Sequence, residues 1–102
     1  MKYEIKIPEK VKVGGFDYKI EMGGKVNLDL QADASWGKCA NQLRRIRLDD
    51  SINSSQLSET FIHEALHAIE DIYVANADEH CISALANGLH QVFEGLGIRF
   101  IK

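Results

Sequence analysis

Two histidines and a glutamate in the second half of the chain have the spacing of a metal site. Residues 63–67 follow the HExxH pattern, with His63, Glu64 and His67 at its defining positions. A helix turns by about 100° and rises about 1.5 Å per residue, so the two imidazoles lie one turn apart and can bind one ion. Neutral imidazoles suit Zn²⁺, and a catalytic zinc has three protein ligands and an open position for water. The pattern therefore predicts zinc on His63 and His67, with Glu64 beside the water as general base.

The third ligand has to come from outside the motif. The later residues that could serve are Asp71, Asp78, Glu79, His80, Cys81 and His90. On a second predicted helix, Glu79 lies at the edge of the apolar side, His80 points nearly opposite, and His90 lies about 16 Å further along the axis. Helical geometry therefore favours Glu79. A structural role is the alternative, because residues 76–79 also form a capping box with Glu79 at its third helical position.

Two acidic residues close to the motif have a different expected role. Asp71 follows His67 by one turn, and three ligands stacked along one straight helix cannot converge on a single ion. Glu70 and Asp71 are therefore expected to accept hydrogen bonds from imidazole N–H groups, which would orient the rings. The competing interpretation of the whole motif is a solvated helix face on which the histidines stand four residues apart by chance.

The helix that carries the motif has clear start signals. Asn53 is a good N-cap, and Gln56 can return a hydrogen bond from three residues further on. Apolar residues at intervals of three and four then predict one helix over residues 54–73 and a second over residues 77–94. Gly95 ends the second helix.

The first half of the chain alternates with period two. Apolar residues at every second position predict a strand near residues 3–7 and a β-hairpin over residues 11–22, with Gly14-Gly15 in its turn. A second hairpin is expected over residues 35–48, turning near residue 40. Residues 25–33 alternate only weakly and are predicted to be a strand or irregular.

These elements predict one α+β domain over residues 1–102, mainly β in residues 1–50 and mainly α in residues 51–102. Its sheet is expected to be antiparallel, with both helices packed on it. The chain has 102 residues, 45% of them hydrophobic, and a net charge of -3, which suits a single core with one shallow cleft. The lack of excess Lys and Arg argues against nucleic acid as a partner.

The composition also bears on location. No stretch approaches the ~18–20 uninterrupted apolar residues that cross a membrane, and residues 1–6 alternate in polarity, unlike a signal peptide. Cys39 and Cys81 are too few for a disulfide framework and are expected to remain thiols in a reducing compartment. The sequence therefore predicts a cytoplasmic protein that does not insert into membranes.

Three stretches together resemble a known family. They are residues 60–69 with the HExxH motif, Asp78-Glu79, and residues 84–92. They are similar to small metallopeptidase-like proteins of phages and prophages, which belong with the gluzincins and resemble the very short minigluzincins. The resemblance covers about residues 37–94. It implies a zincin-like fold, and it implies that the protein acts in a bacterial host cell. It also implies zinc on His63, His67 and Glu79, with Glu64 as base and a peptide or protein as substrate.

The resemblance further implies where a substrate binds. The implied site is the upper-rim strand that contains Arg44, Arg45, Ile46 and Arg47, along which a peptide would pair through its main chain. An edge strand protected from aggregation by charge has the same pattern and is the alternative. The larger gluzincins also provide a transition-state electrophile near the carboxyl end, and His90, Tyr73 and Arg99 are the candidates here. Residues 97–102 are expected to pack on the sheet, or to lie in the cleft as in the minigluzincins.

Two functions fit the sequence. The first is a zinc-dependent endopeptidase in which a zinc-bound water, activated by Glu64, attacks a peptide bond. The second is a phage-encoded module that binds a protein without cleaving it and has a structural or vestigial zinc site. Glu64 favours the first, because a structural zinc has no need of a carboxylate beside an open position.

Overall fold

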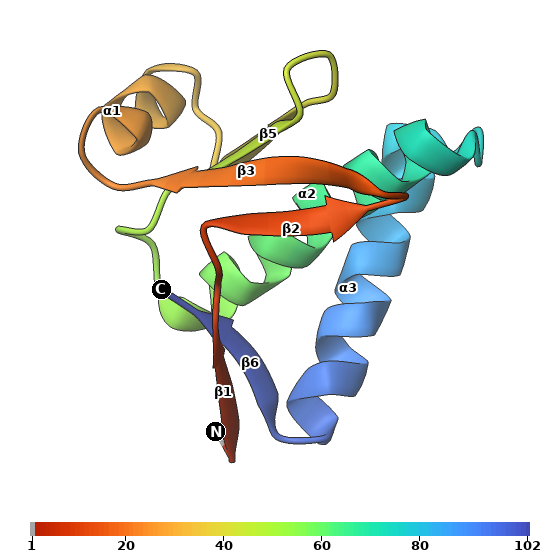
Figure 1. Ribbon diagram of the computed structural model, residues 1–102. Helices are drawn as coiled ribbons and strands as arrows, with labels where there is room; N and C mark the ends of the chain where they lie inside the picture. The colour runs from red at the N-terminus through yellow and green to blue at the C-terminus, as the bar shows by residue number, and fades with distance from the viewer. Residues whose placement is uncertain (1) are drawn as a thin grey trace.

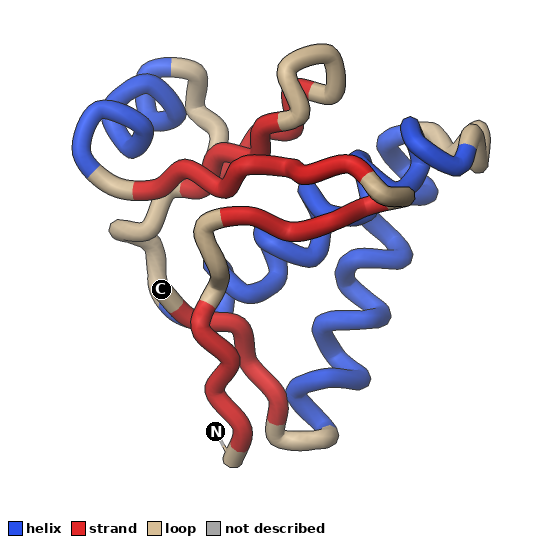
Figure 2. The backbone as a smooth tube through the Cα atoms, viewed as in Figure 1, coloured by secondary structure: helices blue, strands red, loops and turns tan. Residues whose placement is uncertain are grey.

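Four strands form a mixed sheet in the computed structural model, which describes residues 2–102. Figures 1 and 2 show how the helices and strands are arranged. Their order across the sheet is β2 (Lys10–Val13), β3 (Phe16–Met22), β5 (Arg45–Leu48) and β4 (Gly37–Ala40). β2 and β3 form the predicted hairpin, and φ is 57° at Gly14 and 86° at Gly15, as its tight turn requires. β4 and β5 form the second predicted hairpin. The α+β class predicted from the sequence is therefore confirmed.

The sheet differs from the predicted antiparallel one, because β3 and β5 are parallel. Parallel neighbours need a long connection, and here that connection contains a helix and β4. The helix, α1 (Gly24–Ala32), packs against β3 and β5. The expectation of a strand or irregular segment over residues 25–33 is therefore wrong.

Helix α1 is hard to recognise from the sequence because its apolar residues Val26, Leu28 and Leu30 alternate as in a strand, and Leu28 lies on another face than the other two. Leu30 is 1% exposed, whereas Leu28 is 66% exposed. Tertiary hydrogen bonds secure the start of the helix instead. Asn27 Oδ1 accepts hydrogen bonds from two backbone N–H groups, one just before α1 and one in the loop that leads to α2.

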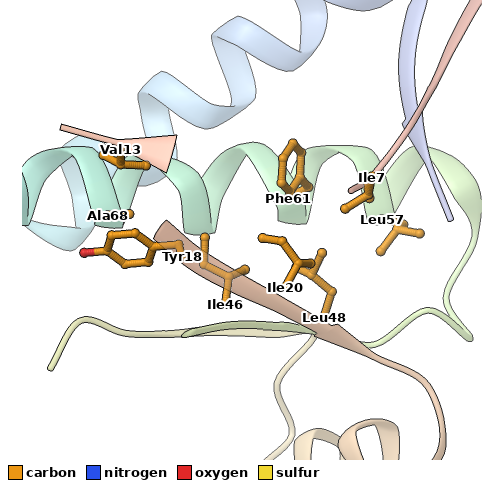
Figure 3. Packing of buried hydrophobic residues seen from close by; sticks show 9 residues of the cluster. All are labelled: Ile7, Val13, Tyr18, Ile20, Ile46, Leu48, Leu57, Phe61 and Ala68. Atoms are coloured by element: carbon orange, nitrogen blue, oxygen red, sulfur yellow. The ribbon is translucent and has the colours of Figure 1, made fainter. Parts of the chain in front are cut away.

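The helix that carries the HExxH motif, α2 (Ser54–Tyr73), has its predicted limits. The Asn53 side chain accepts a hydrogen bond from the Gln56 N–H, as a capping residue should. α2 lies along one face of the four-stranded sheet, and the main core lies between them (Figure 3). The buried core residues are Ile7, Val13, Tyr18, Ile20, Ile46, Leu48, Leu57, Phe61 and Ala68.

The second helix, α3 (Glu79–Gly95), packs against α2. It begins two residues later than predicted, because Asp78 is the N-cap and accepts a hydrogen bond from the Cys81 N–H. Only part of its apolar side is covered. Ile82 and Ala86 are buried, whereas Val92 is 57% exposed.

The last strand, β6 (Ile98–Ile101), pairs in parallel with β1 (Tyr3–Lys6) to form a separate two-stranded sheet. Phe100 of β6 packs edge-on against Phe61 of α2, with ring centroids 5.1 Å apart. The carboxyl-terminal segment therefore packs on α2 and α3, with β1 beside it (Figure 1), and does not fill the cleft described below. Among the described residues, no helix has the length and apolar character needed to cross a membrane.

Candidate metal centre

Helix α2 turns His63 and His67 toward the same point. Their Nε2 atoms lie 3.2 Å apart, and the rings are tilted by 60° with centroids 4.9 Å apart. Both side chains are about one quarter exposed, 23% for His63 and 27% for His67. The spacing of four residues therefore brings the two imidazoles together at a point that solvent can reach.

The carboxylate of Glu79 reaches both rings from the first turn of α3. Its Oε1 lies 2.9 Å from the Nε2 of His63, and its Oε2 lies 2.8 Å from the Nε2 of His67. The capping-box interpretation of Glu79 is wrong. Asn76 has a positive φ of 55° outside the helix, and Asp78 is the N-cap, so Glu79 is the first helical residue rather than the third.

With Glu79 ionised, hydrogen atoms alone do not satisfy the three contacts. If Glu79 accepts a hydrogen bond from each ring, both Nε2 atoms carry a hydrogen, and they face each other at 3.2 Å with no lone pair between them. A cation that takes lone pairs from all three donors removes this conflict. The contacting pairs are 2.8–3.2 Å apart, close to the edge of about 3.3 Å of a tetrahedron with zinc-ligand distances. The three residues therefore could hold a small divalent cation.

Glu64 lies beside this group but is not part of it. Its side chain points between α2 and the sheet, and the residue is only 7% exposed. Burial, together with the negative charge of Glu79, raises the pKa of Glu64 to about 7. The charge of a cation held by the three ligands would lower this pKa and favour the ionised form of Glu64, which can accept a proton.

These side chains line a cleft of about 550 Å³. Its walls come from the segment leading into β4, from α2, and from the first half of α3. They are formed by Ser35, Trp36, Gly37, Lys38, Cys39, Gln56, Glu59, Thr60, His63, Glu64, His67, Glu79, Ser83 and Asn87. One of its walls is the end strand of the sheet.

That end strand is β4, not the strand expected from the sequence. β5 is paired with β3 on one side and with β4 on the other, so its main chain has no free edge for a peptide. Both interpretations of residues 44–48, as a substrate-pairing edge and as a charge-protected edge, are therefore wrong. Strand order depends on how distant segments pair, and a local pattern of Arg and apolar residues does not contain it.

The four residues expected to bind substrate have other environments. Ile46 is fully buried in the core. Arg47 forms ion pairs with Glu21 and Asp29 on the neighbouring strand and helix. Arg44 lies over the ring of Phe16, 3.9 Å from its centroid, and Arg45 is exposed. None of the four lines the cleft.

The remaining sequence candidates are not part of the group of three ligands. Asp71, His80 and Cys81 are exposed, and within the described chain no hydrogen bond joins the Glu70 or Asp71 carboxylate to either imidazole. His90 contacts the Ser55 hydroxyl at 3.2 Å.

The candidate electrophiles lie outside the cleft. Among the described residues that line it, Tyr73, His90 and Arg99 are absent. Arg99 binds both carboxylate oxygens of Glu94, at 2.6 and 3.1 Å, and the hydroxyl of Ser54 at 2.8 Å. Gly37 lines the cleft but was not among the residues predicted from the sequence. Its small size and its place before a predicted turn are its only local signals.

Comparisons of the chain with protein-family models, with curated proteins and with solved structures found no match. Its function therefore has to be inferred from the residues of the cleft.

Proposed function

We propose that the protein is a zinc-dependent peptide hydrolase. The observation that carries the proposal is the convergence of His63, His67 and Glu79, with donor atoms within 4.8 Å of one another, beside the buried carboxylate of Glu64. A site that only needs to hold a metal gains nothing from a fourth, non-ligating carboxylate at its side. An enzyme that hydrolyses amides needs such a group to move a proton.

The roles divide between the ligands and Glu64. A bound Zn²⁺ would act as a Lewis acid that lowers the pKa of a water molecule to about 7 and polarises a carbonyl. Glu64 accepts a proton from the attacking water and then delivers it to the amine nitrogen as the C–N bond breaks. The products are a carboxylic acid and an amine, so the reaction uses only the peptide and water.

The substrate would bind along β4. Trp36 O accepts a hydrogen bond from the Asp49 N–H, and inward and outward main-chain groups alternate along an antiparallel strand. The N–H and C=O groups of Gly37 and Cys39 therefore point to the side of β4 that has no partner strand in the described chain. An extended peptide that pairs there would lie beside Glu64 and bind through its main chain, with little preference for sequence.

The finer expectations from the sequence belong to the same proposal. We infer a zincin-like fold of the gluzincin type, because a glutamate from a later helix faces an HExxH helix. The two cysteines are free, which supports a reducing location such as the cytoplasm of a bacterial host that carries a phage or prophage.

The test combines metal analysis with a cleavage assay. Native protein and the Glu64→Gln variant are loaded with Zn²⁺, and zinc content and cleavage of dye-labelled, unfolded casein are measured for both. The proposal predicts one zinc per chain in both proteins and cleavage by the native protein alone. Full zinc occupancy without cleavage in either protein would refute the hydrolase and favour a module that binds a protein without cutting it. Cleavage that survives in Glu64→Gln would show that another group moves the proton.

A further inference from the structure

β4 passes unusually close to α2 at Gly37. A Cβ atom placed on Gly37 would lie 2.5 Å from Thr60 Cγ2, 3.1 Å from Glu64 Cγ and 3.2 Å from Glu64 Oε2. Carbon atoms in ordinary contact are about 3.5–4.0 Å apart, so the first distance is impossible without movement. The space above Glu64 therefore exists only because residue 37 has no side chain.

Conformational freedom does not explain the glycine. The backbone of Gly37 lies outside the positive-φ region, which five other glycines of the chain occupy. An alanine could adopt the same backbone angles. What it could not do is fit between β4 and the side chains of Thr60 and Glu64.

The neighbours of Gly37 have little room to give way. Thr60 is 8% exposed, and its hydroxyl donates a hydrogen bond of 2.7 Å to the Gln56 carbonyl, which orients the side chain. Glu64 is 7% exposed and is enclosed by α2 and the sheet. A group at position 37 would therefore displace the Glu64 carboxylate, whose position a proton-transfer reaction depends on.

We propose that Gly37 is a positioning residue, which leaves free the space that the Glu64 side chain occupies between β4 and α2, beside the candidate metal ligands. The proposal rests on the proposed hydrolase function for its catalytic consequence. The contact itself does not depend on activity. Gly37 acts through Glu64, and its own contribution is the absence of a side chain.

The test separates the fold from the position of Glu64. Gly37→Ala is compared with Thr60→Ser and with the double variant, because serine lacks the Cγ2 atom that meets the added methyl at 2.5 Å. Gly37→Ala is expected to lower the melting temperature, and the double variant to recover it. The added methyl still lies 3.1–3.2 Å from Glu64 in the double variant. Its kcat on labelled casein should therefore stay about 100-fold below that of Thr60→Ser, with KM and zinc content unchanged.

Two further measurements complete the design. Gly88→Ala is the matched control, because a Cβ there meets nothing within 4 Å and alanine suits the middle of α3 better than glycine. It should raise the melting temperature slightly and leave kcat unchanged. In the native protein, NMR should show a nuclear Overhauser effect between the Gly37 Hα and Glu64 Hγ protons.

The outcomes distinguish this inference from the proposed function. Absence of the Overhauser effect, or recovery of kcat together with melting temperature in the double variant, would overturn the positioning role. If the native protein cleaves nothing, the hydrolase proposal fails. The positioning role is then decided by the Glu64 Hγ resonances, which must differ between the double variant and Thr60→Ser.

Discussion

The candidate metal centre predicts a large stabilisation by Zn²⁺ that depends on Glu79. A ligand that binds only the folded protein at 100 times its dissociation constant adds about 2.7 kcal/mol to the free energy of unfolding. For a domain of about 100 residues, each kcal/mol corresponds to about 4–8 °C in melting temperature. Scanning calorimetry or dye-based thermal melting should therefore show a rise of roughly 11–22 °C at that zinc concentration.

Glu79→Gln tests whether the third ligand matters. In the native protein the two carboxylate oxygens lie 2.9 and 2.8 Å from the imidazoles, and the amide removes the negative charge and one oxygen. Mutating a residue that only supports a metal ligand lowers metal affinity by up to about 100-fold, and we take this value for the loss of Glu79. At the same zinc concentration, the stabilisation by zinc would then fall to about 0.4 kcal/mol. The melting temperature should then rise by about 2–3 °C instead.

His80→Ala is the control for zinc binding at a surface imidazole. His80 is adjacent to Glu79, exposed and outside the ligand group, so its variant should keep the full shift. A native protein that zinc does not stabilise would refute the metal centre. Equal shifts in native protein and Glu79→Gln would show that the third ligand is another residue.

Three further predictions concern single side chains. Asp49 is 2% exposed. Burial acts to raise its pKa, but the hydrogen bonds that it accepts, those from Ser51 above all, lower the pKa below its ordinary value. The stability that the ionised Asp49 contributes is therefore lost as the pH falls through its pKa in the folded protein. Urea unfolding at pH 7 should show a free energy of unfolding about 1–3 kcal/mol lower for Asp49→Asn than for the native protein. The variant should also lose less stability than the native protein when the pH is lowered, and an equal loss in the two proteins would contradict this. Burial, followed by the charges of Glu64 and Asp71, raises the pKa of Cys39 to about 12. Because the thiolate is the form that reacts, iodoacetamide at pH 8 should label the exposed Cys81 before Cys39, which peptide mass mapping would show. Trp36 is the only tryptophan and lines the cleft, so Co²⁺ should quench its fluorescence in the native protein and not in His67→Ala.

The sequence was most informative where structure depends on neighbours along the chain. The limits of α2 follow from the Asn53 cap and from apolar spacing, and both are local properties. The first hairpin follows from alternation and from the glycine pair at residues 14 and 15. The convergence of His63 and His67 follows from helical geometry alone.

The features that the sequence did not predict depend on distant segments. α1 is secured by bonds between Asn27 and the loop before α2, and its own residues alternate like a weak strand. The place of β5 inside the sheet results from parallel pairing with β3, which no local pattern encodes. The start of α3 was misplaced because Asn76 and Asp78 are both good caps, and only the backbone conformation separates them.

The pairing of β1 with β6 has a consequence for how the protein folds. Tyr3 is aligned with Ile98, and its N–H donates a hydrogen bond of 2.7 Å to the Gly97 carbonyl. The loop between Tyr3 and Ile98 spans almost the whole chain, and closing it costs more entropy than closing the shorter loops of the four-stranded sheet. We therefore expect this ladder to form after α2 and α3 have brought its two strands together. Pulsed hydrogen exchange during refolding should protect the Tyr3 amide later than those of α2, and simultaneous protection would refute this order. The pairing of the two short strands would then join the two ends of the chain only after the core has formed.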